Sequence, residues 1–210
     1  MQFKMIVEHF LCLLFPTRST TQKVAGVSLG DLGELLRPVQ VGSVTTLLPY
    51  RAPLVRALIL EAKFHESTKS FKLLGTVLAD HILSLIEESG FDEKRYVLIP
   101  IPLSKKRFRE RGYNQVEKVI RSALTSLPAS VSLSTTVLKR TRDTLPQTTL
   151  SRSKRLTNMQ EAFSVSENLD TNCTYIVVDD VMTTGATMQA ALEALAARGI
   201  SVSSAVSLAH

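Results

Sequence analysis

Apolar side chains recur along much of the chain with the period of an amphipathic helix. Between residues 54 and 62, and again between 71 and 88, they return every three or four positions, which predicts two helices with one buried face each. Helices are also predicted over residues 114–127 and 186–197, the second ending just before Gly199. A shorter helix is expected over residues 31–36, with Asp31 as its cap.

Short apolar runs predict strands between these helices, at residues 43–48, 96–101, 136–138, 175–178 and 200–208. Strands that alternate with helices are typical of a mostly parallel sheet with helices on both faces. We therefore expect an α/β domain over residues 50–210. Residues 1–49 form a small N-terminal appendage, with a helix predicted over residues 3–14 and a polar loop over residues 17–22.

The composition is that of a globular protein without a membrane anchor or a structural metal site. Hydrophobic residues make up 44% and charged residues 21% of the chain. No stretch approaches the roughly 20 apolar residues of a membrane span, and Glu8 and His9 interrupt the apolar start, so we expect a cytoplasmic protein. Cys12 and Cys173 stand far apart and the histidines lack metal-ligand spacing, so no zinc is expected.

Residues 175–187 carry the clearest chemical signal. An apolar strand is followed at once by Asp179 and Asp180, then by small hydroxyl residues and glycine, and then by a helix. The two carboxylates can accept hydrogen bonds from two ribose hydroxyls and can hold a hydrated Mg²⁺, directly or through water. A phosphate would fit the backbone N–H groups of the loop at the helix N-terminus. The loop residues are Thr183, Thr184, Gly185, Ala186 and Thr187. An ordinary strand, turn and helix is the alternative.

Positive charge is concentrated in two segments. The net charge is +6 and the isoelectric point is about 9.5, which favours an anionic partner. Residues 105–111 and 139–155 hold 11 of the 25 Lys and Arg, with Glu110 and Asp143 as their acids. A solvated helix face and a solvated loop, with a short helix from about Ser151, are the alternatives to anion binding. The candidates for pyrophosphate or nucleic-acid contact are Lys105, Lys106, Arg107, Arg109, Arg111, Arg152 and Arg155.

The segment 175–187 resembles the signature of type I phosphoribosyltransferases that binds phosphoribosyl diphosphate (PRPP). The resemblance implies that Asp179 and Asp180 bind the ribose hydroxyls, with Mg²⁺ as cofactor, and that residues 183–187 bind the 5′-phosphate. It also implies a type I phosphoribosyltransferase-like fold. No Gly-Lys-Ser/Thr follows the strand, so a nucleoside-triphosphate loop of the Walker A type is a poor rival.

A wider pattern, over roughly residues 50–207, is similar in order and spacing to the ComF family. It includes Pro-x-Pro-Leu from Pro100, Arg-x-Arg-Gly-Tyr-Asn-Gln from Arg109, and Arg-x-Arg-x-Thr-x-x-Gln from Arg140. The resemblance implies a link to DNA uptake during bacterial competence. Many members carry an N-terminal zinc ribbon, but Ser19 and Gln22 stand here where a Cys-x-x-Cys is expected, so the appendage is predicted to be metal-free.

Three functions stay open at this point. The first is an enzyme that transfers phosphoribose from PRPP to an unknown acceptor. Its catalytic residues would be Asp179, Asp180, Arg140 and Arg142. The two arginines belong to a cationic loop that could close over the diphosphate and stabilise charge on the leaving pyrophosphate. The second is a protein that handles single-stranded DNA with the basic segments. The third is a partner-docking module with a vestigial site. Protein partners from the competence machinery would fit the second and third functions.

Overall fold

The computed structural model describes residues 17–90, 94–141, 162–167, 169–170, 172–200 and 202–210. Its main sheet has the strand order β1-β2-β8-β7-β3-β4, in which β1 is antiparallel to β2 and all other neighbours are parallel. The strands are β1 (Val39–Val41), β2 (Val44–Leu48), β3 (Arg95–Pro100), β4 (Val131–Leu133), β7 (Cys173–Val181) and β8 (Val202–Ala209). A separate antiparallel ribbon joins β5 (Leu138–Arg140) to β6 (Phe163–Val165).

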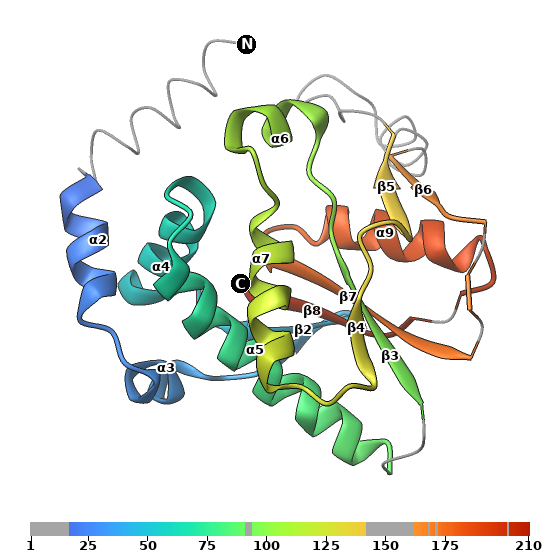
Figure 1. The fold of residues 1–210 in the computed structure, drawn as a ribbon, viewed down its shortest axis with the longest axis horizontal. Helices are drawn as coiled ribbons and strands as arrows, with labels where there is room; N and C mark the ends of the chain where they lie inside the picture. Colours follow the sequence, from blue (N-terminus) through green and yellow to red (C-terminus); the bar gives the residue numbers. More distant parts are fainter. Residues whose placement is uncertain (1–16, 91–93, 142–161, 168, 171, 201) are drawn as a thin grey trace.

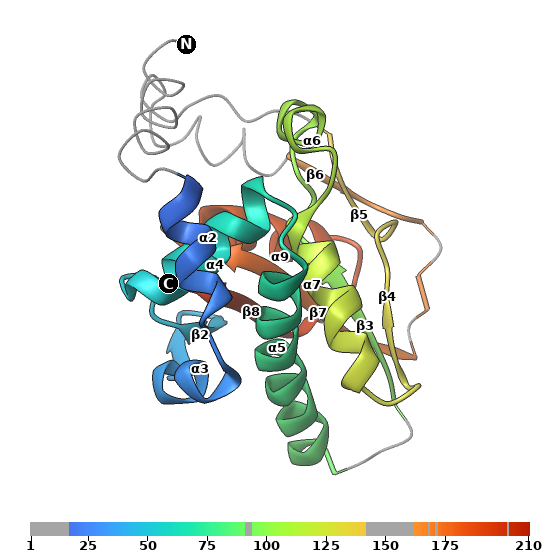
Figure 2. The same ribbon diagram turned by 60° about the vertical axis from the view of Figure 1, so that its left-hand side comes forward.

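Helices cover both faces of this sheet (Figure 1). One face carries α4 (Pro53–Phe64), α5 (Thr68–Glu88) and α7 (Gln115–Ala123), with α2 (Thr17–Ala25) and α3 (Leu29–Leu35) packed outside them. The other face carries α9 (Ala186–Ala196). A 3-10 turn (Leu124–Ser126) follows α7, and α6 (Lys105–Arg111) projects beyond the sheet, as Figures 1 and 2 both show. The expected α/β architecture, with a mostly parallel sheet covered on both faces, is confirmed.

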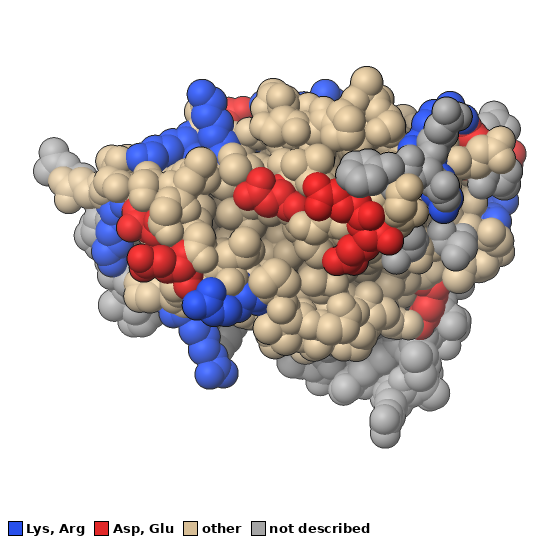
Figure 3. Space-filling model, turned by 90° about the horizontal axis from the view of Figure 1, so that it is seen from below, with Lys and Arg blue, Asp and Glu red and all other residues tan. Residues whose placement is uncertain are grey.

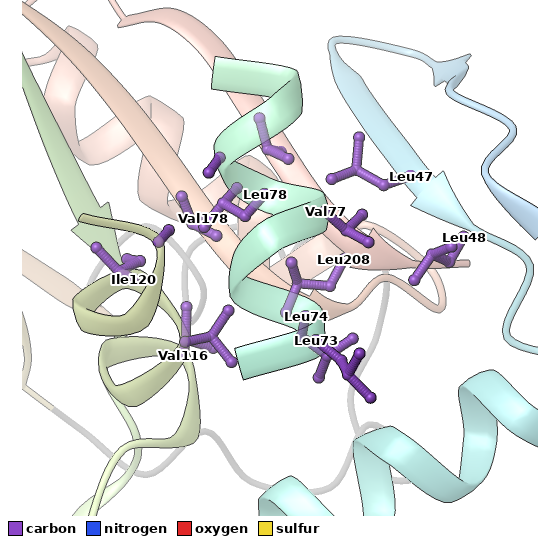
Figure 4. Close-up of a cluster of buried hydrophobic side chains, with 14 of the residues drawn as sticks. Leu47, Leu48, Leu73, Leu74, Val77, Leu78, Val116, Ile120, Val178 and Leu208 are labelled. Carbon is purple, nitrogen blue, oxygen red and sulfur yellow. The ribbon is translucent and has the colours of Figure 1, made fainter. Parts of the chain in front are cut away.

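The core under α5 fixes the strand that carries the candidate site. Leu74 and Leu78 of α5 are fully buried against the sheet, where Val178 of β7 and Leu208 of β8 belong to the same cluster (Figure 4). Ile120 of α7 completes this layer. Burying one such side chain contributes roughly 1.5–3 kcal/mol. Since Val178 is part of this layer, the packing holds β7 in place up to the residue before the carboxylates.

Two sequence-based predictions in the appendage are wrong. Residues 17–22, predicted as a polar loop, form the first part of α2. The Thr20 hydroxyl donates to a Glu61 carboxylate oxygen of α4 at 2.7 Å, so a tertiary contact outweighs the polar local sequence. Helix α3 begins at Leu29 and its N-cap is Ser28. Asp31 is the third helical residue and forms a capping box with Ser28, so it is not the N-cap.

The remaining boundaries lie close to the predicted ones. The strand predicted over residues 175–178 extends to Val181 and includes both carboxylates, and the one predicted over 136–138 starts at Leu138. The pattern gave no prediction for β1, β4 or β6. Residues 44–48 precede the expected domain start at residue 50, yet β2 pairs with β8 in the main sheet. The predicted helices over residues 3–14 and from about Ser151 lie outside the described residues.

In the described part of the chain, no helix has the length and apolar character needed to cross a membrane.

Gly75 allows the close approach of α5 and α7. A Cβ at this position would lie 2.9 Å from the Ser122 Cβ and 3.0 Å from the Ala123 nitrogen. We predict that Gly75→Ala lowers the free energy of unfolding by about 1–3 kcal/mol, because overpacking outweighs the higher helix propensity of alanine. Urea unfolding measures this. Gly33→Ala in α3 is the control, since nothing lies within 4 Å of its Cβ. A Gly75→Ala protein as stable as wild type would contradict the prediction.

Candidate functional site

The two carboxylates lie where β7 loses one of its neighbours. Pairing with β3 ends at Val178, opposite Pro100, whereas pairing with β8 continues through Asp179 to Val181. The chain after Pro100 turns away into α6, which leaves the edge of β7 beside the carboxylates unpaired with β3. Ligands of open α/β sheets bind beyond the carboxyl ends of the strands, and Asp179 lies at this end of the central strand.

Asp179 and Asp180 face opposite sides of the sheet, because side chains alternate along a strand. Val178 belongs to the core on the α5 side, and Asp180, two residues later, faces the same way. Val177 belongs to the core on the α9 side, and Asp179 shares that orientation. A ligand that contacts both carboxylates must therefore lie across the end of β7.

The loop after β7 is shaped to leave N–H groups open at the start of α9. Gly185 is the residue before the helix and has φ 74° and ψ −6°, a left-handed conformation that favours glycine. Gly185 supplies no side-chain cap, and within the described residues the Ala186 N–H donates to the Thr184 Oγ1 at a long 3.5 Å. Thr183 and Thr184 are exposed, while Ala186 and Thr187 are half-buried. The loop thus offers hydroxyl and N–H donors to an anion.

Two side chains from distant elements hold Asp180. The Lys63 ammonium of α4 lies 3.1 Å from its Oδ1, and the Gln115 amide at the start of α7 donates to its Oδ2. Asp180 is 7% exposed, so this carboxyl group is nearly buried and has a polar partner on each oxygen. Lys63 and Gln115 belong to segments that resemble the ComF family, but neither was predicted to contact the carboxylates. Both stand on helices far from residue 180 in the sequence, and only the fold brings them together.

Among the described residues Asp179 has no ion-pair partner, and its pKa is raised. Burial and the charge of Asp180 raise the pKa of Asp179 from 3.8 to about 7, against the lowering effect of the Asp180 backbone N–H, Lys63 and Arg107. That N–H donates to the Asp179 Oδ1 at 2.8 Å. Arg107 of α6 is therefore close enough to act electrostatically on the site. Asp179 therefore exchanges its proton near neutral pH.

The sequence Arg-Gly-Tyr-Asn-Gln at residues 111–115 fixes the position of Gln115. Arg111 donates to the Gln115 Oε1 at 2.9 Å, and its guanidinium lies 5.1 Å from the ring centre of Phe64. The Tyr113 hydroxyl donates to a carbonyl of α4 at 2.9 Å. Asn114 caps α7 and donates to the carbonyl at the end of β3 at 3.0 Å. Arg111, predicted to contact an anion, is thus directed at neighbouring side chains.

The other predicted cations divide into three groups. Lys105, Lys106, Arg107 and Arg109 are all exposed on α6. Arg140 ends β5 and lies 5.4 Å from the ring centre of Phe163. Arg142, Arg152 and Arg155 lie outside the described residues. Figures 1 and 2 both place α6 and the β5–β6 ribbon at the same end of the molecule.

A groove lies between α6 and β5. Its volume is about 420 Å³, and its walls combine apolar, basic and uncharged polar side chains with one carboxylate, that of Glu117. The residues that line it include Pro100, Leu103, Lys105, Phe108, Arg109 and Leu138. Phe108 is 52% exposed among these cations. In contrast, carboxylates lie in the middle of the face that points away from α6, with Lys and Arg mostly at its edges (Figure 3).

The described residues contain no group of three or more His, Cys, Asp or Glu side chains that could hold a metal ion. A metal at the carboxylates would therefore need further oxygen ligands from water or from a bound molecule.

The family model of the phosphoribosyl transferase domain matches residues 78–210, and the chain belongs to this family. The match includes the strand with both carboxylates, the loop at residues 183–187 and α6. A comparison with curated proteins gave no match. The fold and the family together define a phosphoribosyltransferase-like protein, and the type I signature recognised in the sequence lies within the matched part.

The charge of Asp179 is predicted to destabilise the folded protein above neutral pH. Its folded pKa of about 7 exceeds the ordinary 3.8, so its contribution to stability decreases as the pH rises from about 4 to 7. We predict that Asp179→Asn raises the Tm at pH 8 by about 2–4 °C, the shift for roughly 1 kcal/mol. The gain should be smaller at pH 5, where Asp179 is protonated.

Differential scanning calorimetry at the two pH values checks this effect. Asp80→Asn, at an exposed position of α5, removes the same charge away from the site and should leave the Tm unchanged. The assignment would be wrong if Asp179→Asn lowered the Tm at pH 8.

Proposed function

We propose that the protein binds PRPP across the end of β7 and transfers its phosphoribosyl group to an acceptor. The observation that carries the proposal is the arrangement of Asp179 and Asp180 beside an uncapped helix start in a phosphoribosyl transferase domain. The carboxylates would accept hydrogen bonds from the ribose hydroxyls. The loop at residues 183–187 would donate to the 5′-phosphate from its backbone N–H groups and threonine hydroxyls.

The residues around the site suit a transfer that depends on binding rather than on a covalent intermediate with the protein. In the proposed reaction the bond between C1 and the diphosphate oxygen breaks, pyrophosphate leaves with its electron pair, and the acceptor forms a bond to C1. The cations of α6 and Arg140, with Arg142, Arg152 and Arg155, would stabilise the negative charge of the leaving group.

Mg²⁺ fits this site as a partner of the ligand. It prefers oxygen ligands and usually keeps several waters, and Asp179 and Asp180 supply carboxylate oxygens without a complete protein cage. When bound, the ion would neutralise charge on the diphosphate. Asp179 would hold it directly or through water, because its carboxylate is not engaged by a described cation at ion-pair distance.

The resemblance to the ComF family supports a role in DNA uptake during competence, in the cytoplasm. The family model matched by the chain is the broader phosphoribosyl transferase domain, so this assignment rests on the sequence patterns around residues 100–115 and 140–155. A screen of nucleobases for release of pyrophosphate from PRPP would identify the acceptor.

Loss of the carboxylates is predicted to abolish PRPP binding without unfolding the protein. We expect Asp179→Asn to weaken PRPP binding about 10- to 100-fold, since a hydrogen bond to a charged group contributes roughly 1.5–3 kcal/mol. The double variant Asp179→Asn with Asp180→Asn should show no measurable binding. Isothermal titration calorimetry with Mg²⁺ measures both, with Asp80→Asn as the control. Unchanged affinity in a folded double variant would remove the ribose role.

A second candidate function is binding of single-stranded DNA. The observation that favours it is Phe108, which is 52% exposed on a helix with four exposed cations. An aromatic ring among cations can stack on a base while the cations contact the phosphates.

The salt dependence of DNA binding separates the two functions. With four to six phosphate contacts, log affinity should fall with log salt at a slope of about −3 to −4. Replacing Lys105, Lys106 and Arg107 with Ala should reduce this slope by about two units, whereas Asp179→Asn should leave it unchanged. Fluorescence anisotropy with a labelled oligonucleotide measures the slope. Absence of binding at 0.15 M salt would exclude the DNA function and assign these cations to pyrophosphate.

A further inference from the structure

Lys63 reaches the candidate site from a partly buried position. Its side chain is 18% exposed and its ammonium lies 3.1 Å from Asp180, whose side chain is 10% exposed. The cations of α6, in contrast, are exposed to solvent. Water screens a partly buried charge less than an exposed one, so Lys63 would act more strongly than an α6 cation on an anion at the same distance.

The ammonium of Lys63 has N–H donors that no other described residue accepts. An ammonium has three N–H donors and no acceptor. Among the described residues, Asp180 is the polar partner of the Lys63 ammonium. This contact uses one N–H, so two N–H groups of Lys63 have no acceptor among those residues. Gln115 holds the other oxygen of Asp180 and is itself held by Arg111. Lys63 is thus a cation placed on a fixed carboxylate at the edge of the site.

In the proposed complex, the orientation of the ribose would direct its diphosphate toward this cation. Asp179 faces the α9 side of the sheet, where the loop at residues 183–187 begins the helix, and Asp180 faces the α4 side. In a ribofuranose, the carbon that carries the phosphate arm and C1 lie on the two sides of the ring oxygen. A ribose with its 5′-phosphate in the loop and its hydroxyls on the carboxylates therefore points C1 toward Asp180 and Lys63.

We propose that Lys63 is a further ligand-binding residue, which bridges Asp180 and the diphosphate of PRPP. This inference rests on the proposed function. In the free protein Lys63 neutralises Asp180. In the complex it keeps that contact and donates to a diphosphate oxygen, which offsets the repulsion between the carboxylates and a polyanionic ligand. Arg111, Tyr113 and Gln115 are positioning residues, because they hold the start of α7 against the end of α4 and Asp180.

The contact between Lys63 and the diphosphate is tested with two ligands, one that carries the diphosphate and one that lacks it. Isothermal titration calorimetry with Mg²⁺ would compare PRPP and ribose 5-phosphate on wild type, Lys63→Met and Lys63→Arg. We expect Lys63→Met to weaken PRPP about 10- to 100-fold and ribose 5-phosphate less than about threefold. Lys63→Arg, which keeps the charge, should bind PRPP within about fivefold of wild type.

Lys118→Met is the matched control. Lys118 is also ion-paired, with the Glu66 Oε1 at 3.0 Å, but it is 42% exposed on α7, and its loss should leave both affinities unchanged. If Lys63→Met weakens the binding of both ligands by the same factor, the proposal is overturned and Lys63 only positions Asp180. If it changes neither affinity, the proposal is also overturned. If wild type does not bind PRPP at all, the proposed function itself fails.

A second pair of variants covers the case in which Lys63→Met does not fold, because it leaves Asp180 charged and unpaired. Neither Asp180→Asn nor the double variant Asp180→Asn with Lys63→Met carries the Asp180 carboxylate. Both are titrated with pyrophosphate and Mg²⁺. We expect the double variant to bind pyrophosphate about tenfold or more weakly than Asp180→Asn. Equal pyrophosphate affinities would overturn the diphosphate contact.

Discussion

The candidate site depends on how the protein keeps two neighbouring carboxylates at the end of a buried strand. Their mutual repulsion grows as water is removed, and a charged side chain that is nearly buried needs a partner. Asp180 receives Lys63 and Gln115, each from a different helix. Asp179 instead has its pKa raised to about 7, so that the pair carries less negative charge in the absence of a ligand. The neighbouring helices are arranged to satisfy this constraint.

The packing of α4, α5 and α7 serves the same end. Gly75 allows α7 to approach α5, and Asn114 fixes the start of α7 at the end of β3. Tyr113 ties this point to α4, whose last turn carries Lys63. Lys63 and Gln115 can meet at Asp180 because these contacts hold two helix ends together. The hydrophobic core under α5 and the polar contacts at the site are therefore parts of one structure.

The arrangement also links stability to binding. A carboxylate that is easily protonated near neutral pH costs stability when it is charged, and the residue before α9, Gly185, has no side chain that could cap the helix. Both features become favourable when a ligand supplies hydroxyls and a phosphate. Sites built for ligands commonly depart in this way from the arrangement that would be most stable alone.

The sequence by itself determined the fold class, the central strand with its carboxylates and the loop at residues 183–187. These features are local, because they depend on the order of apolar, acidic and small residues over about a dozen positions. The same holds for α5 and α9, whose apolar periodicity is long enough to predict a helix. The boundaries of short strands such as β1 and β6 were not predictable, because three residues carry too little pattern.

Only the tertiary structure decided which side chains surround the carboxylates. Residues 17–22 were predicted as a loop, but they belong to a helix in which Thr20 contacts Glu61. Arg111 was predicted from its local charge to contact an anion, whereas its contacts with Phe64 and Gln115 follow from the fold. Lys63 belongs to the segment that resembles the first domain helix of the ComF family, but the sequence did not indicate its contact with a carboxylate more than a hundred positions away. Long-range pairs of this kind follow from packing, which a single sequence does not display.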